Sequence, residues 1–109
     1  MFFSKPEYTV QEVAEMLKLP NPPQLIDTRE SPEWDIAHLP GSQPLTHSFI
    51  DDVLTGWDKT TPIVTVCHHG VRSLNMAKFL KQQGFTNVRS MRGGVEAWAL
   101  EIDRTMQRY

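Results

Sequence analysis

The chemistry in this chain centres on its single cysteine, Cys67, which stands between a strand pattern and a helix pattern. Residues 63–66 are rich in β-branched side chains and predict a buried strand, whereas residues 73–83 predict a helix that stops at Gly84. Backbone N–H groups at a helix N-terminus favour negative charge, so a thiol there becomes a thiolate more readily than a free thiol. The loop also carries a glycine and an arginine, and it therefore indicates sulfur or oxyanion chemistry.

The length and composition set the class of protein. A chain of 109 residues favours one domain, which we expect to span residues 1–109 with a core of about 8–103. Hydrophobic residues make up 39% and charged residues 22%, as in globular proteins, and no apolar run is long enough to span a bilayer. The first residues lack a signal-peptide pattern, and a lone cysteine fits a reducing compartment, so we expect a cytoplasmic protein.

Charge is distributed unevenly along the chain. Residues 1–58 hold ten acids and three bases, whereas residues 59–109 hold three acids and eight bases. No acid occurs from Lys59 to Val95, the segment that contains Cys67. This segment predicts a positive field that draws an anion to the thiol, although chance segregation of surface charge explains it equally well. Nucleic-acid binding is not expected, because the bases are dispersed and the chain is mildly acidic overall.

The elements before the cysteine loop are short. A capping box at Thr9 and Glu12 predicts a helix ending near Leu19. Ser31, followed by a proline, predicts the cap of a short helix that runs to about Ala37. Strands are expected at 24–27 and 43–45, and a further helix at 49–54.

Beyond the cysteine loop, residues 88–91 predict a strand, Gly93-Gly94 a tight turn, and residues 95–106 a final helix. Strands that alternate with helices at short intervals predict an α/β domain with a largely parallel sheet. Ligands bind such sheets outside the carboxyl ends of the strands, where Asp27 and Cys67 both fall.

Several ordered segments resemble the rhodanese family of single-domain sulfurtransferases. Residues 25–29 with Glu33-Trp34 resemble its first signature, and residues 37–42 resemble its Gly-His-Ile-Pro-Gly-Ala turn, with Ala37 and Ser42 as departures. Residues 67–73 resemble its active loop, Cys-x-x-Gly-x-Arg-Ser. Residues 84–85 and 93–98 resemble its closing segment, so the match spans about 8 to 100. The resemblance implies a five-stranded parallel sheet with helices on both faces.

The resemblance also implies a reaction. Cys67 would attack the outer sulfur of a small anionic donor such as thiosulfate, become a persulfide, and pass that sulfur to cyanide or a thiol. The backbone N–H groups of residues 68–72 could curl around the sulfur, and Gly70 would permit the turn. No cofactor or metal is required. We expect a monomer with no nucleic-acid or membrane partner, although a protein could donate or accept the sulfur.

The sequence leaves more than one role open for most residues of the cysteine loop. Arg72 would bind the donor's sulfonate or complete a positive rim, or else pair structurally with Asp27 or Glu33. Ser73 would hydrogen-bond the sulfur or cap the helix. His68 and His69 would set substrate preference, assist proton transfer or only expose their backbone N–H groups. We expect the last for one of the two, because adjacent side chains in a loop tend to diverge. Val71 completes this candidate substrate-binding set, while Asp27 and Arg29 would brace the loops near the site.

Three rival functions remain. Phosphatases and arsenate reductases use a Cys-x5-Arg loop, whereas this chain has Cys-x4-Arg, a smaller cradle suited to one sulfur atom. A non-enzymatic sulfur carrier or regulatory module is the main alternative, although family members of that kind usually lack the loop cysteine. Zinc binding by Cys67 and histidines 38, 47, 68 and 69 is disfavoured, because adjacent histidines fit tetrahedral ligand spacing poorly.

Overall fold

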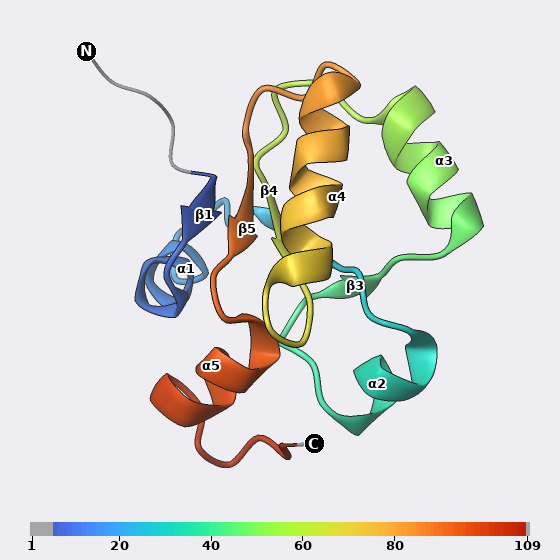
Figure 1. Ribbon diagram of the computed structural model, residues 1–109. Helices are drawn as coiled ribbons and strands as arrows, with labels where there is room; N and C mark the ends of the chain where they lie inside the picture. The colour runs from blue at the N-terminus through green and yellow to red at the C-terminus, as the bar shows by residue number, and fades with distance from the viewer. Residues whose placement is uncertain (1–5, 109) are drawn as a thin grey trace.

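The computed structural model describes residues 6–108 and is built on a five-stranded sheet whose strands all run parallel (Figure 1). The strand order is β1-β5-β4-β2-β3. The strands are β1 (Glu7–Tyr8), β2 (Gln24–Asp27), β3 (Gln43–Pro44), β4 (Ile63–Val66) and β5 (Val88–Met91). Because every pair is parallel, the carboxyl ends of the central strands meet at one edge of the sheet.

Helices connect the strands and cover both faces of the sheet (Figure 1). They are α1 (Val10–Met16), α2 (Ser31–Ile36), α3 (His47–Gly56), α4 (Val71–Gln82) and α5 (Gly94–Glu101). Side chains of α1 and α5 pack against one face, and side chains of α3 and α4 pack against the other. None of the helices among residues 6–108 is long and apolar enough to cross a bilayer.

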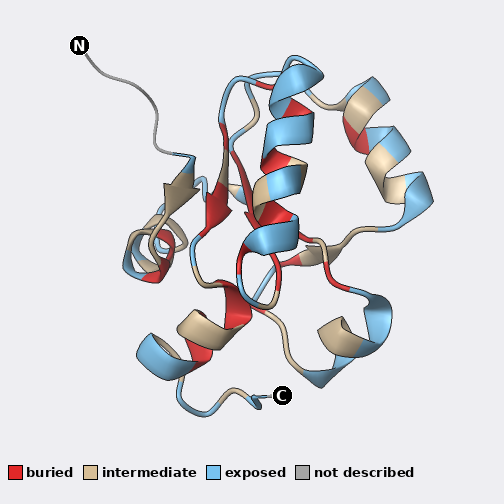
Figure 2. Cartoon of the chain, viewed as in Figure 1, coloured by how far each residue is buried: buried red, intermediate tan, exposed pale blue. Residues whose placement is uncertain are grey.

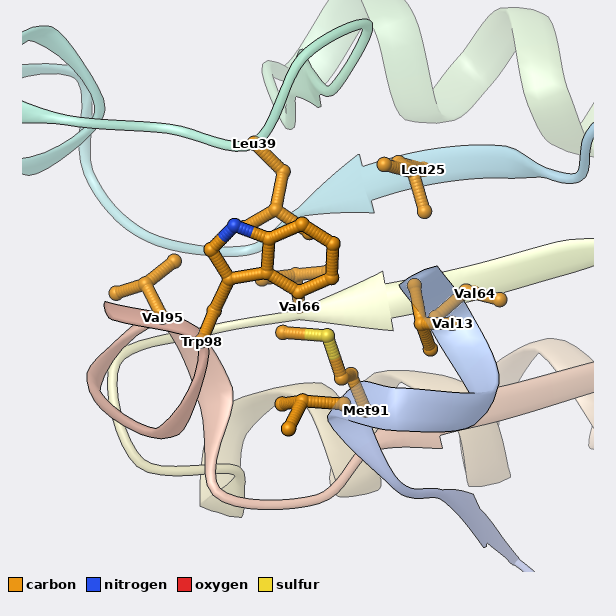
Figure 3. Close-up of a cluster of buried hydrophobic side chains, with 9 residues drawn as sticks. Val13, Leu25, Leu39, Val64, Val66, Met91, Val95 and Trp98 are labelled. Carbon is orange, nitrogen blue, oxygen red and sulfur yellow. The ribbon is translucent and has the colours of Figure 1, made fainter. Parts of the chain in front are cut away.

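The first core lies between the sheet and the α1–α5 pair (Figure 3). The Trp98 indole of α5 lies over the sheet beside Leu39 and Val66, and Val13 of α1 approaches Val64 (Figure 3). Strand residues alternate between faces, so Val64 and Val66 point to this core while Ile63 points to the other. This core fixes the start of α5 against the end of β4.

The second core lies under α3 and α4. Its buried members are Ile26, Val53, Ile63, Ala77, Leu80, Phe85 and Val88. The buried stripe of α4 faces the sheet while its other side is exposed (Figure 2). Burial on both faces explains why all four residues of β4 are buried and why its sequence does not alternate between apolar and exposed polar residues.

The predicted fold class is confirmed: the sheet is parallel, has five strands and carries helices on both faces. The sequence analysis missed β1, because two residues are too few to show a periodicity; β1 is defined by its pairing with Ser90 and Met91 of β5. The strand predicted at 43–45 is found at Gln43–Pro44, and the helix predicted at 49–54 begins earlier, at His47, with Thr46 as its N-cap.

Several predicted helix ends were wrong. α2 begins at Ser31 with Glu30 as the N-cap, so Ser31 is the first helical residue rather than the cap. α1 ends at Met16 and is followed by a turn, and α5 ends at Glu101 rather than near Met106. The C-terminal segment instead turns back, and Arg108 pairs with Glu96 of α5. That pairing depends on the tertiary course of the chain, which helical periodicity does not report.

Candidate functional site

The candidate site lies where β2, β4 and β5 end together. Asp27 is the last residue of β2, Cys67 follows β4, and Gly93-Gly94 follows β5. A short loop joins β4 to α4, and another joins β5 to α5. Each of these helices has a glycine in the left-handed region as its N-cap. The N-termini of α4 and α5 therefore both lie near Cys67, as the hydrogen bonds below show.

The Cys67 thiol is buried and receives two hydrogen bonds, one from its own loop and one from the first turn of α4. The side chain is part of the core, at 1% relative exposure. The Gly70 N–H donates to Sγ at 3.0 Å, and the Ser73 hydroxyl donates to Sγ at 3.3 Å. Gly70 has a φ of 105°, where a side chain would be strained and its Cβ would lie 3.1 Å from the Gly93 nitrogen. Two donors aimed at one sulfur favour its anionic forms.

Ser73 lies inside α4 and does not cap it. The helix begins at Val71 with Gly70 as N-cap, two residues earlier than predicted, so the capping alternative for Ser73 is wrong. Its hydroxyl instead contacts Cys67 Sγ and, at 2.6 Å, the hydroxyl of Ser90 on β5. Its carbonyl accepts a hydrogen bond from Thr65 Oγ1 of β4 at 2.6 Å. These residues are all buried, so the thiol is next to a cluster of buried hydroxyl groups.

The start of α5 holds the other side of the loop. Val95 N–H donates to the Cys67 carbonyl at 2.8 Å, and Glu96 N–H donates to the His68 carbonyl at 3.1 Å. Gly94 sits so close that a Cβ there would meet the Cys67 carbonyl oxygen at 2.2 Å. Only glycine allows this approach, so the double glycine after β5 serves the cysteine loop as well as the turn.

Two arginines approach α2 in different ways. Arg29 is fully buried and pairs with Asp27 at 2.8 Å, and it also donates to the carbonyls of Glu33 and Ala37. Asp27 and Arg29 therefore brace the segment from β2 through α2. Arg72 is 46% exposed and forms a bidentate pair with the Glu33 carboxylate at 2.9 and 3.2 Å. Of the two structural partners considered for Arg72, Glu33 is the one it contacts.

The imidazole rings of His68 and His69 stack on one another. Their centroids are 4.0 Å apart and their planes differ by 26°, so the expectation that they diverge was wrong. Burial lowers the pKa of His68, and the neighbouring His69 lowers it further, while Glu96 and Glu33 act in the opposite direction. A stacked, partly buried imidazole favours its neutral form and can accept a proton at neutral pH.

Acids from outside the acid-free segment reach this site. Glu33 comes from α2 and Glu96 from α5, and both raise the pKa of His68. Arg108 binds Glu96 through two hydrogen bonds of 2.9 and 2.8 Å, which lowers the pKa of the Glu96 carboxyl. The field around Cys67 is therefore mixed and less positive than the segment from Lys59 to Val95 suggests by itself.

Three residues that shape the site were not among the predicted site residues: Thr65, Ser90 and Gly94. Thr65 and Ser90 are paired in register on adjacent strands, and each is a buried hydroxyl residue. A polar residue within a buried strand that ends at the site was the available signal. Among residues 6–108, no group of three or more His, Cys, Asp and Glu side chains is arranged to hold a metal ion.

Comparison with known proteins identifies the family. The model of the rhodanese-like domain matches residues 9–101, nearly the whole chain. The chain belongs to the rhodanese-like domain family. This rhodanese-like chain is 35% identical over 78 residues to the thiosulfate sulfurtransferase GlpE of Pseudomonas aeruginosa, covering 72% of this chain and 71% of that protein.

Solved structures share the fold of this rhodanese-like chain. A rhodanese-like domain protein from Staphylococcus aureus superimposes with a TM-score of 0.75 at 26% identity, covering 86% of this chain and 91% of that one. The human single-domain sulfurtransferase TSTD1 gives a TM-score of 0.78 at 19% identity, covering 90% and 98%. Family membership thus supports sulfur transfer as the class of activity, and the geometry around Cys67 adds its own argument.

Proposed function

We propose that this protein is a sulfurtransferase that carries sulfane sulfur on Cys67. In the first half-reaction the Cys67 thiolate attacks the outer sulfur of thiosulfate, the sulfur–sulfur bond of the donor breaks, and sulfite leaves with the bonding electron pair. In the second, cyanide or a thiolate attacks the terminal sulfur of the resulting persulfide anion, and the Cys67 thiolate is released. No external oxidant or reductant is needed, because the transferred sulfur leaves one bonding electron pair with sulfite and gains another from the Cys67 thiolate.

The observation that carries this proposal is the pair of donors on a buried sulfur. Gly70 N–H and Ser73 Oγ both point at Cys67 Sγ, at 3.0 and 3.3 Å. Such donors stabilise the thiolate that attacks and the thiolate that leaves, and they need no rearrangement during the reaction. A buried cysteine without a catalytic role would need neither donor, since an ordinary thiol packs as a small hydrophobic group.

The donor is proposed to be a small anion, with thiosulfate as its representative. GlpE of Pseudomonas aeruginosa bears thiosulfate in its name, and the exposed Arg72 stands two positions beyond Gly70 at the start of α4. Arg72 is held by Glu33, so a donor would share or displace that carboxylate. Exposed ion pairs contribute only about 0.2–1 kcal/mol, so exchanging Glu33 for the donor would cost little free energy.

Mass spectrometry after incubation with thiosulfate tests the mechanism. Wild-type protein should gain about 32 Da, located on the peptide that contains Cys67, and cyanide should remove it as thiocyanate. Cys67→Ser should show neither the adduct nor thiocyanate formation while keeping the wild-type circular dichroism. A Cys67→Ser variant with full activity would refute the proposal.

The rival functions predict different results with the same sample. A phosphatase or arsenate reductase would hydrolyse an aryl phosphate or reduce arsenate and form no adduct, whereas the Cys-x4-Arg loop favours the single sulfur. A sulfur carrier would form the adduct but release it to a protein thiol and not to cyanide. Assaying all the acceptors in parallel therefore separates the enzyme from the carrier.

A further inference from the structure

Ser90 lies beneath the reacting sulfur without touching it. It sits in β5 opposite Thr65 and has no exposed surface. Its hydroxyl oxygen is 2.6 Å from the hydroxyl oxygen of Ser73, which is 3.3 Å from Cys67 Sγ. A line of two buried hydroxyl groups therefore runs from the sulfur to β5.

Counting hydrogens fixes the direction of this line when the sulfur is anionic. A hydroxyl has one hydrogen to donate, and Ser73 uses it on Cys67 Sγ. The Ser73 oxygen can then take part in the 2.6 Å contact only as an acceptor, so Ser90 must be the donor. Thr65 meanwhile donates to the Ser73 carbonyl and keeps this turn of α4 in place.

We propose that Ser90 is a positioning residue whose hydroxyl orients the Ser73 hydrogen toward an anionic Cys67 sulfur. A donor behind Ser73 polarises its O–H bond and strengthens the hydrogen bond to the sulfur. When the sulfur is a neutral thiol, both hydroxyl groups can reverse, because the thiol hydrogen can then be donated to Ser73. The pair thus follows the charge of the sulfur in both half-reactions, and its role in sulfur transfer rests on the function proposed above.

Charged and titratable groups also lie around the cysteine loop, where several of them act on His68 next to Cys67, and they must be held constant in a test. They come from the loop and α4 (His68, His69 and Arg72), from α2 (Glu33), from the segment after β2 (Arg29) and from α5 (Glu96). A substitution at Ser90 changes none of them in identity or formal charge. A change in the pH response of Cys67 in Ser90 variants therefore reports on the hydroxyl line.

The test measures the rate of Cys67 alkylation by iodoacetamide against pH, with the full-length chain. We expect the pH of half-maximal rate to rise by about 0.5–1 unit in Ser90→Ala, because the anionic sulfur loses part of its hydrogen-bond support. Ser90→Thr and Ser90→Val form a matched pair of nearly equal shape that differ in the hydroxyl. Threonine should keep the wild-type profile, and valine should shift it as alanine does.

Kinetics of sulfur transfer provide the second readout. Ser90→Ala and Ser90→Val should lower kcat about three- to tenfold at neutral pH and leave KM for thiosulfate unchanged, since Ser90 is buried away from the donor. Equal shifts in the threonine and valine variants would mean that packing volume is the cause and would overturn the proposal. Coincident alkylation profiles in all four proteins would overturn it as well.

The two proposals can fail separately. If wild-type protein forms no adduct with thiosulfate, the proposed function is wrong, whatever the alkylation profiles show. If the adduct forms but the threonine and valine variants behave alike, sulfur transfer stands and the role of Ser90 is wrong. The alkylation assay uses only the thiol and iodoacetamide, so it does not depend on the sulfur donor.

Discussion

The inner and outer sides of the Cys67 loop are built differently. The inner side consists of Thr65, Ser73, Ser90 and Gly94, all buried and held by short hydrogen bonds or backbone contact. The outer side consists of His68, His69, Val71 and Arg72. Val71 is 69% exposed, and the half-exposed Arg72 pairs with the partly exposed carboxylate of Glu33.

This difference separates two tasks. The inner side offers one arrangement, because a buried hydroxyl must keep its partner and a backbone contact leaves no room for a side chain. It can therefore set the nucleophilicity of the sulfur. The outer side can exchange its partners at little cost, so it can set which donor or acceptor approaches. Substitutions on the inner side should change kcat or the fold, and substitutions on the outer side should change KM.

The largest effect is expected for Gly94→Ala. Its Cβ would lie 2.2 Å from the Cys67 carbonyl oxygen and 2.4 Å from that of His68, and the φ of 62° adds backbone strain. We expect the free energy of unfolding to fall by about 2–5 kcal/mol and sulfur transfer to be lost. Urea denaturation and a thiocyanate assay measure both.

Gly56→Ala is the matched control for this substitution. Gly56 ends α3, and a Cβ there would meet nothing within 4 Å. Its stability should stay within about 1 kcal/mol of wild type. If Gly94→Ala proves as stable and active as this control, the close contact between α5 and the cysteine loop is not essential.

The next effect is expected for Ser73→Ala, which removes the hydroxyl from Cys67 Sγ and leaves Ser90 without that partner. Loss of a hydrogen bond to a charged group should lower kcat about tenfold to a hundredfold at neutral pH. KM for thiosulfate should change by less than about twofold, because the Ser73 hydroxyl supports the Cys67 sulfur and does not bind the donor. A rise in KM with unchanged kcat would mean that Ser73 acts on donor binding, as the residues of the outer side are expected to do.

Smaller and opposite effects are expected for the two members of the Arg72–Glu33 pair. Arg72→Gln should raise KM for thiosulfate about two- to fivefold and weaken its dependence on salt, because an anion loses attraction. Glu33→Gln should lower KM, since it removes a negative charge beside Arg72 while the glutamine can still accept the Glu30 N–H in the α2 capping box.

Lys18→Gln, in the turn after α1, controls for the loss of one positive charge from an exposed ion pair away from the loop. Its KM should match that of wild type. Stability should change by less than about 1 kcal/mol in all three variants. KM shifts of the same sign in Arg72→Gln and Glu33→Gln would contradict an electrostatic role for this pair.

The smallest effect concerns the pH dependence of stability through His68. Burial lowers the pKa of His68 below its usual 6.5 in the folded protein, so the unfolded chain binds the proton more readily. The stability due to the neutral ring is complete above the unfolded pKa and is lost as pH falls from about 6.5 through the lower folded value. His68→Gln should reduce this loss, as measured by urea midpoints near pH 7.5 and near pH 5.5. An identical loss in wild type and variant would contradict the assigned cause.

Local patterns in the sequence were enough to predict the parallel α/β fold and the place of Cys67 within it. The β-branched run of β4, the loop glycine and the helical pattern of α4 are contiguous, so their meaning does not depend on distant residues. The capping box at Thr9 and Glu12 formed as predicted for the same reason. The alternation of strands and helices placed Asp27 and Cys67 at one edge of the sheet.

Tertiary structure alone decided which groups meet at the sulfur. Ser90 is 17 residues from Ser73, and Glu33 is 39 residues from Arg72, so neither contact follows from a local pattern. The acid-free segment around Cys67 acquires Glu33 and Glu96 as neighbours through folding, which changes its field. Sequence patterns report the conformation of a segment, whereas hydrogen bonds and charges act through space on whatever the sheet brings together.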